Sequence, residues 1–240
     1  MTTSAEQFGW VLHRRPWRES SLLIEFFSHH QGRIGLVAKG ARSARSAWRG
    51  LAEPFCPLTA TWTRRGEMGT LTGLDPAGSR YLLTGRALWC GLYANELILK
   101  LLLRDDPSPE LFGIYGELLS ELATDSELGP AVRRFELGLL ASLGVSPDFE
   151  HDAVNGQSVK ADGLYHLDPE SGFIPTDRPG PTVYPGDAIL ALAGGMNDRL
   201  HGGRECRRLM RQLIDHQLAG RRLESRRLFE NMSHRTGGRG

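Results

Sequence analysis

The spacing of apolar residues changes near residue 80, and this change limits what the chain can fold into. Up to Leu74, apolar residues come in short runs that alternate with polar ones, which is typical of β-strands. From Ala87 onward they recur every three or four residues, as on one face of an α-helix. The sequence therefore predicts an α+β protein, with a strand-built domain over residues 1–80 and a helical domain over residues 81–240.

Five short strands are predicted in the first domain. They cover residues 8–13, 20–27, 34–39, 55–63 and 69–74. Arg14, Arg15 and Pro16 are expected to end the first of them. Because five strands in about 75 residues leave no room for a long helix, we expect a small closed barrel, and the five-stranded OB-fold is the best match. The faces and loops of OB-folds commonly bind single-stranded nucleic acid.

A run of cations follows the third predicted strand. Residues 39–51 carry a cation every three or four positions, separated by small residues and without any acidic side chain. Since like charges repel and little apolar surface is present, we expect this basic loop to have no fold of its own until a polyanion binds. Trp48 lies inside the loop and is our candidate for base stacking, whereas the other aromatic residues should be core. A solvated loop without function is the alternative reading.

Charge is segregated along the chain. Residues 1–80 hold 11 Lys or Arg and 6 Asp or Glu, residues 81–198 hold 7 and 18, and residues 199–240 hold 11 and 4. Nearly all the cations are arginine, whose planar fork of donors suits phosphate. Two basic ends around an acidic middle indicate a polyanion-binding surface. The candidate DNA-binding residues are Arg14, Arg15, Arg18, Arg33, Lys39, Arg42, Arg45, Arg49, Arg64 and Arg65.

The second domain is predicted to be a helical bundle with one insertion. Helices are expected from residue 87 to near Asp105, and over 109–122, 130–143, 185–192 and 205–218. The first three should form the bundle. Residues 145–184 are rich in Gly, Pro and Asp, which indicates an irregular insertion or a pair of short strands near 163–167 and 172–174. Basic helices follow at the C-terminal end.

Motifs of catalysis and of metal binding are missing from the sequence. It has no phosphate loop of the Walker type, no Gly-x-Ser-x-Gly and no His-Glu-x-x-His, so we expect no enzyme activity. The three cysteines form no Cys-x-x-Cys pair, and His151, Asp152 and His166 lack a metal-binding spacing. We therefore expect no metal and no cofactor. Without a signal pattern or a long apolar run, a cytoplasmic, nucleoid-associated location is expected, with no membrane contact.

Several runs resemble the RecO family of bacterial recombination mediators. They are WVLHRRPWRESSLL (10–23), GRIGLVAKGAR (32–42), RGEMGTL (65–71), GLYANEL (91–97), AVRRFEL (131–137) and SRRLF (225–229). The resemblance spans essentially the whole chain. It implies an N-terminal OB-fold, a helical bundle and non-enzymatic work in DNA repair: binding of single- and double-stranded DNA, annealing of complementary strands, contact with the single-stranded DNA-binding protein SSB and with RecR, and help in loading RecA.

Two further expectations follow from this resemblance. Arg133 and Arg134, with Leu137 and Leu140 on the same helix, are predicted to hold the acidic, phenylalanine-ending tail of SSB, because such a tail needs a cation and an apolar slot. Many RecO proteins carry a cysteine zinc module after this helix. Here the corresponding Asp152-Ala-Val-Asn155 has no cysteine, so this chain resembles a metal-free branch.

Two other functions compete with this reading. The barrel could be a protein-interaction scaffold without direct DNA binding, whose arginines only maintain solubility. An enzyme is the third possibility, which the missing motifs disfavour. Salt-dependent binding of an oligonucleotide separates the first two readings, because phosphate contacts release counterions and protein contacts do not.

Overall fold

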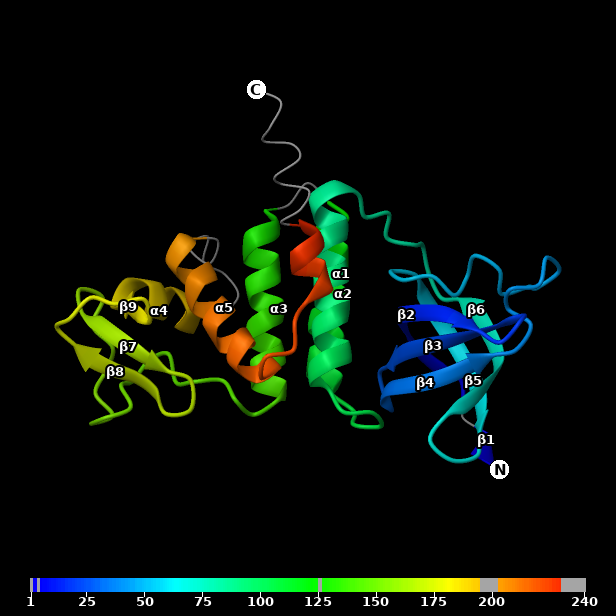
Figure 1. The fold of residues 1–240 in the computed structure, drawn as a ribbon, viewed down its shortest axis with the longest axis horizontal. Coiled ribbons are helices and arrows are strands. Elements are labelled where there is room, and N and C mark those ends of the chain that lie inside the picture. The colour runs from blue at the N-terminus through cyan, green and yellow to red at the C-terminus, as the bar shows by residue number, and fades with distance from the viewer. Residues whose placement is uncertain (1, 4, 125–126, 195–202, 230–240) are drawn as a thin grey trace, which may run out of the picture. The chain divides into compact units, whose positions relative to one another are not determined.

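The structure is a computed structural model that describes residues 2–3, 5–124, 127–194 and 203–229 (Figure 1). The chain forms two compact units, one of Met1–Thr124 with Leu223–Gly240 and one of Asp125–Arg222. Within the described ranges, no helix has the length and apolar character needed to cross a membrane.

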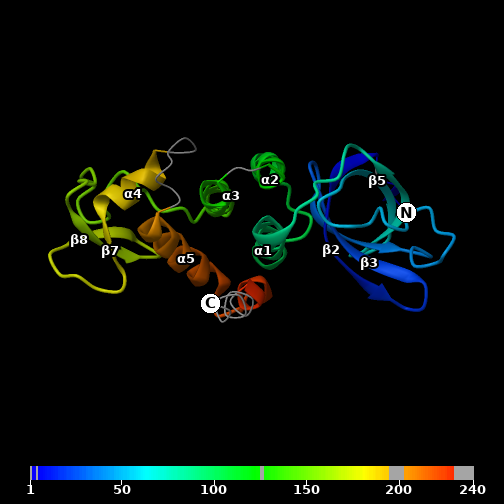
Figure 2. The ribbon, with the colours of Figure 1, turned by 90° about the horizontal axis from the view of Figure 1, so that it is seen from above.

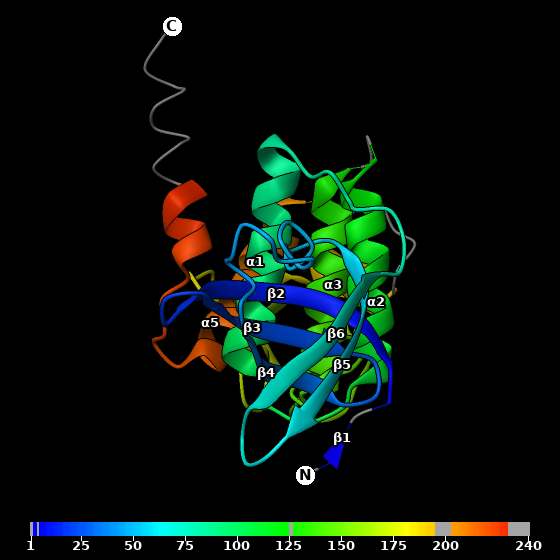
Figure 3. The same cartoon turned by 90° about the vertical axis from the view of Figure 1, so that its right-hand side faces the viewer.

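The N-terminal strands form a closed barrel, seen in Figure 3. Its strands are β2 (Gln7–Trp17), β3 (Ser21–Ser28), β4 (Gly32–Ala38), β5 (Pro57–Arg64) and β6 (Gly69–Pro76). The sheet order is β1-β5-β2-β3-β4-β6, with β1 (Thr2–Thr3) added to the edge of β5. Pairing of β5 with β6 closes the barrel. The predicted five-stranded OB-type barrel and the α+β class are confirmed.

Alternating apolar side chains fill the barrel, as the period-two pattern predicts. Leu22, Ile24 and Phe26 of β3 all point into one buried cluster, which also contains Trp62 of β5. Gly69 begins β6 beside this cluster. A Cβ there would lie 2.7 Å from Leu36 and 2.9 Å from Trp62, so only glycine fits without displacing core side chains.

The first barrel strand is longer than predicted. Arg14, Arg15 and Pro16 do not end β2; they continue it and pair with β3 as far as Trp17 opposite Ser21. Only residues 7–10 of β2 also pair with β5, and Val11 makes an isolated bridge to Pro54, so residues 12–17 are paired on one side. Proline is tolerated in such an edge, where its missing N–H breaks no second ladder. The cations of this stretch therefore sit on a rigid ribbon.

Two helices cover the outer face of the barrel in the first unit. They are α1 (Gly85–Leu101) and α2 (Pro109–Leu122), which pack on each other. Phe112 of α2 lies 4.5 Å from Trp10 and 5.3 Å from Phe27, measured between ring centroids. The outward side chains of Trp10 and Phe27 are thus buried. A helical turn over residues 224–229 also belongs to this unit.

The second unit combines helices with a small sheet (Figure 2). Its helices are α3 (Leu128–Ser142), α4 (Gly186–Ala193) and α5 (Arg204–Leu218), and its strands are β7 (Leu164–Asp168), β8 (Gly172–Thr176) and β9 (Val183–Pro185). The predicted insertion is therefore ordered, as an antiparallel sheet of order β8-β7-β9. The two compact units divide the chain after Thr124 and after Arg222. The domain boundary at residue 80 stays a prediction.

Candidate nucleic-acid interface

The barrel register shows where the predicted cationic turns lie on the barrel. Arg14 lies opposite Ile24, Ile24 opposite Leu36, and Leu36 beside Gly69, so one row crosses β2, β3, β4 and the start of β6. At about 4.8 Å per strand, Arg14 and Gly69 lie within about 15 Å of each other. Because β2 and β6 run in the same direction, the β2–β3 turn, which follows Arg14, and the β5–β6 hairpin, which precedes Gly69, lie on opposite sides of this row. The backbone N–H of Arg42 donates to the carbonyl of Ser20 at 2.8 Å, which attaches the basic loop to the β2–β3 turn.

The basic loop is folded, contrary to the expectation from its charge. Successive turns join Ser43 to Gly40, Ser46 to Ser43 and Arg49 to Ser46 through backbone hydrogen bonds of 2.9–3.2 Å. Ala41 and Ala52 at its two ends are buried in the barrel core, and Trp48 and Leu51 pack against that core. These apolar contacts offset the ordering entropy that the sequence argument had left uncompensated. Trp48 is half-buried and packs against this core, and its role in base stacking stays a prediction.

Four of the ten candidate cations have partners within the protein. Arg14 pairs with Glu53 at 2.5 Å, and Arg33 pairs with Glu25 at 3.0 Å. Arg64 makes a two-pronged contact with Asp105. Arg42 donates from Nη1 to the carbonyls of Arg18 and Glu19, at 3.2 and 3.1 Å. Tertiary contacts thus give these four arginines a structural role.

The other six cations are exposed and make no ion pair among the described residues. They come from the β2–β3 ribbon, the basic loop and the β5–β6 hairpin. They are Arg15, Arg18, Lys39, Arg45, Arg49 and Arg65. Because none of them has an ion-pair partner among the described residues, the cations of the β2–β3 ribbon and the basic loop add into one positive field, and Arg65 adds a charge on the hairpin. We call these six residues the cationic rim.

Sequence reasoning missed three charged residues beside this rim. Glu25 on the outer face of β3 contacts both Arg33 and Arg104, and Asp105 holds Arg64. The hydrogen bonds from Arg64, and its charge, hold the pKa of Asp105 below its usual range. No local motif marks such pairs, because Arg64 and Asp105 are 41 residues apart in the chain.

Comparison with known proteins adds an independent observation. The family model described as "Recombination protein O N terminal" matches residues 1–80, and the one described as "Recombination protein O C terminal" matches residues 82–227. The chain belongs to the RecO family. The resemblance drawn from its motifs is therefore confirmed.

Individual RecO relatives align over nearly their whole length. A protein named "DNA repair protein RecO" from Azoarcus sp. is 42% identical over 95% of this chain and 96% of its own. Proteins of the same name from Methylococcus capsulatus and Halorhodospira halophila are 41% and 44% identical, over 94% and 97% of this chain and 93% and 99% of their own. This is a RecO-family DNA repair protein.

The predicted SSB-tail residues lie on α3 of this RecO-family chain. Nη1 of Arg133 lies 2.7 Å from a carboxylate oxygen of Glu136, which is 1% exposed. Leu140 is fully buried, whereas Arg134 and Leu137 are half-buried. Of the two predicted leucines, Leu137 is therefore the better placed to meet a peptide. The site itself stays a prediction.

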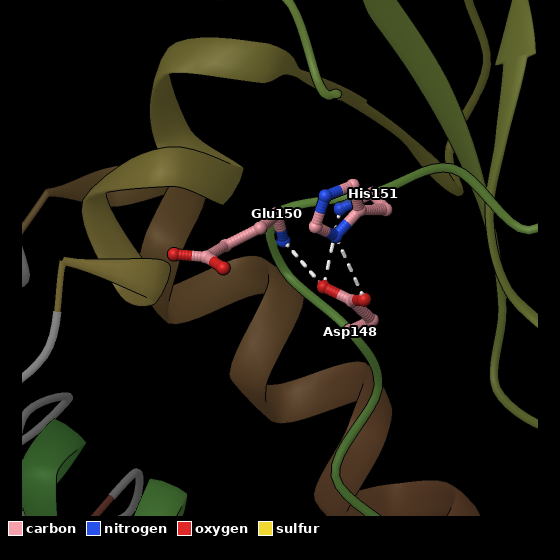
Figure 4. A group of neighbouring side chains, drawn as sticks. All are labelled: Asp148, Glu150 and His151. Carbon is pink, nitrogen blue, oxygen red and sulfur yellow. Dashed lines mark hydrogen bonds and ion pairs between the residues drawn. The ribbon is translucent and has the colours of Figure 1, made fainter. Parts of the chain in front are cut away.

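An acidic group with one histidine lies where the insertion begins (Figure 4). The carboxylate of Asp148 accepts the N–H groups of Glu150 and His151 at 2.8 and 3.1 Å and contacts the His151 ring at 3.0 Å. The Glu150 side chain points away from the His151 ring in Figure 4. These contacts make a tight turn.

Asp152 organises the loop where RecO relatives with zinc would place cysteine. Its carboxylate accepts the backbone N–H groups of Asn155 at 2.7 Å, Val154 at 2.9 Å and Gln157 at 3.1 Å. These bonds, led by that of Asn155, lower the pKa of Asp152. A hydrogen-bonded carboxylate thus holds the turn together, and the absence of a metal stays a prediction.

Proposed function

We propose that this RecO-family protein is a non-enzymatic mediator of recombinational repair that binds single- and double-stranded DNA and anneals complementary strands. In this proposal it contacts SSB and RecR and helps load RecA, and it acts in the cytoplasm at the chromosome. Family membership supports work in DNA repair. The binding, annealing and loading steps are our inference.

The observation that carries the proposal is the cationic rim. Five exposed cations lie on the β2–β3 ribbon and the basic loop at one end of an OB-type barrel, a sixth, Arg65, lies on the β5–β6 hairpin, and no ion pair among the described residues neutralises them. Nucleic-acid affinity of this kind comes from neutralised phosphates and released counterions. Small neighbours such as Gly40, Ala44 and Gly50 let a phosphate chain approach the backbone closely.

This rim suits backbone binding better than base reading. Its side chains lie on the β2–β3 ribbon, the basic loop and the β5–β6 hairpin, where Trp17 of the ribbon is exposed and Trp48 of the loop packs on the core. Stacking on aromatic rings is the usual means of holding unpaired bases. Binding should therefore depend little on sequence, as a protein that anneals arbitrary complementary strands requires.

For SSB, we place the acidic tail on α3 near Arg134 and Leu137. The cation would meet the tail's carboxylates and the leucine its terminal ring. Both residues are half-buried, so they offer surface without leaving the helix. RecR and RecA enter the proposal only through the family, and no residue of this chain is assigned to them.

Fluorescence anisotropy with labelled oligonucleotides of unrelated sequence tests the DNA proposal. Arg45→Glu with Arg49→Glu should weaken binding more than tenfold for every sequence, and it should flatten the dependence of log K on log salt by about two units. Arg178→Glu, an exposed arginine on the loop after β8, is the matched control. Arg42 is a poorer target, because its side chain also holds the loop.

Annealing of SSB-coated complementary strands, with and without the protein, tests the mediator step. Faster annealing that is lost in the Arg45→Glu, Arg49→Glu variant supports the proposal. If the parent protein bound no oligonucleotide at low salt, the barrel would be a protein-interaction scaffold and the proposal would be wrong.

A further inference from the structure

An internal charge network covers the outer face of β4. Glu25 of β3 contacts Arg33 of β4 and also Arg104, which follows α1. Arg33 donates to the carbonyl of Leu102 at 3.0 Å, and the N–H of Asp105 donates to the carbonyl of Arg33 at 3.0 Å. Residues 102–106 are therefore bound across the strand.

This is the surface with which OB-folds usually bind nucleic acid. Their ligands lie on the second and third strands, here β3 and β4, and on the loop between the fourth and fifth, here the β5–β6 hairpin. Two glycines let the covering segment come so close. A Cβ at Gly32 would lie 2.1 Å from the carbonyl oxygen of Asp106, and one at Gly35 would lie 3.2 Å from the Arg104 guanidinium.

Asp105 pairs with Arg64, the cation of this face that lies beside the hairpin. Both carboxylate oxygens of Asp105 meet the Arg64 guanidinium, the two-pronged geometry with which arginine also holds a phosphate. Arg64 donates in addition to the carbonyls of Gly66 and Glu67, each at 2.9 Å. The hairpin backbone therefore keeps the Arg64 fork in place whether or not Asp105 is present.

The Arg64–Asp105 pair is more exposed than the Arg33–Glu25 pair on the same face. The side chains of Arg33 and Glu25 are 15% and 13% exposed, and removing one partner from such a pair leaves a buried charge uncompensated. The side chains of Arg64 and Asp105 are 27% and 41% exposed. Water screens this second pair, so it contributes little to stability and an arriving phosphate can replace the carboxylate.

We propose that Asp105 competes with DNA phosphate for Arg64, so that the chain itself occupies one phosphate site of its barrel. This inference rests on the proposed DNA binding. DNA that reaches the hairpin displaces Asp105, and Arg64 joins the six cations of the rim. Part of the binding free energy of the phosphate–Arg64 contact is offset by the loss of the Arg64–Asp105 pair. This keeps the affinity for naked DNA low, so ligands that bind Arg64 more strongly can displace the DNA.

Asp105→Asn tests this directly. Asp105 has a left-handed backbone, with φ 60°, which asparagine and glycine tolerate, so Asp105→Gly serves as the second variant if the first folds poorly. Releasing Arg64 should raise affinity for an oligonucleotide roughly fivefold to tenfold at 0.1 M salt and steepen the salt dependence by about one unit, the effect of one added phosphate contact.

Asp106→Asn is the matched control, because it removes the same charge from the next residue, which has no contact with Arg64. In a protein that already carries Arg64→Ala, Asp105→Asn should raise the affinity for the oligonucleotide no more than Asp106→Asn does. Equal gains from Asp105→Asn and Asp106→Asn would reduce the effect to net charge and overturn the inference. An unchanged affinity of Asp105→Asn, in a protein that binds DNA, would also overturn it while leaving the proposed function intact. A parent protein without DNA binding would refute the proposed function instead.

Discussion

Ser225 donates two hydrogen bonds to Oε2 of Glu96, from its backbone N–H at 2.9 Å and from its hydroxyl at 2.6 Å. The N–H of Glu224 donates to Oε1 of the same carboxylate at 2.9 Å. Glu96 lies on α1, 129 residues before Ser225. A carboxylate of α1 therefore caps the helical turn of residues 224–229 and holds the basic C-terminal segment in the first unit.

Glu96→Gln should loosen this C-terminal segment. The amide end of glutamine puts a donor against N–H donors, so at least one hydrogen bond to a charged acceptor is lost, at a cost of about 1.5–3 kcal/mol. Faster amide exchange of Ser225, measured by NMR, reports the change. Glu117→Gln on the exposed face of α2 is the control. Equal exchange in both variants would show that Glu96 is not the cap.

Acid should release the same segment in the parent protein. Burial favours the neutral form of Glu96, but the hydrogen bonds from Ser225 and Glu224, with Lys100, outweigh it and lower its pKa. The stabilisation is therefore complete above the unfolded value of about 4.3 and is lost as the pH falls through the lowered folded pKa. The Ser225 amide signal should shift over that range in the parent and stay unchanged in Glu96→Gln.

Tyr115→Phe should destabilise the first unit. The Tyr115 hydroxyl, which is fully buried, donates to Oδ1 of Asn95 at 2.6 Å, and Asn95 donates to the carbonyl of Leu12 at 2.9 Å. Without the hydroxyl, a buried acceptor loses this donor, and we expect a loss of about 1–3 kcal/mol in urea unfolding. Tyr81→Phe, whose ring is half-buried, should change stability little. A Tyr115→Phe variant as stable as Tyr81→Phe would contradict this account.

Arg134→Ala should weaken binding of an SSB tail peptide by about 1.5–3 kcal/mol, the contribution of a charge-assisted hydrogen bond, and leave binding of naked DNA unchanged. Calorimetric titration of the peptide measures it. Arg133→Ala is less informative, because Arg133 also pairs with the buried Glu136. Parent-like peptide binding by Arg134→Ala would move the search to the arginines from Arg204 onward.

Chelator treatment should leave the melting temperature unchanged, whereas Asp152→Ala should lower it. The Asp152 carboxylate organises its loop through three backbone N–H groups, and neither Asp152 nor Asn155 is a soft ligand suited to structural zinc. Asp162→Ala, an exposed acidic residue of the same unit, is the control. Stoichiometric zinc that survives the chelator would disprove the metal-free reading.

The sequence alone determined the elements and their class. Period-two and period-3.6 patterns are local, so each strand of the barrel and each long helix could be found from the residues within it. The wrong structural predictions concern segments whose conformation depends on residues far away in the sequence. Residues 14–17 stay in β2 because β3 pairs with them, and Trp48 orders the basic loop because the barrel core receives it.

Only the tertiary structure decided which cations of the barrel have ion-pair partners among the described residues. In the sequence Arg64 and Arg65 are equivalent neighbours, yet the first is held by Asp105 and the second is exposed. Arg33 likewise reaches Leu102, 69 residues away. Charge is a property of each residue, whereas its neutralisation depends on which groups the fold brings within a few ångströms. A local sequence pattern does not show which groups these are.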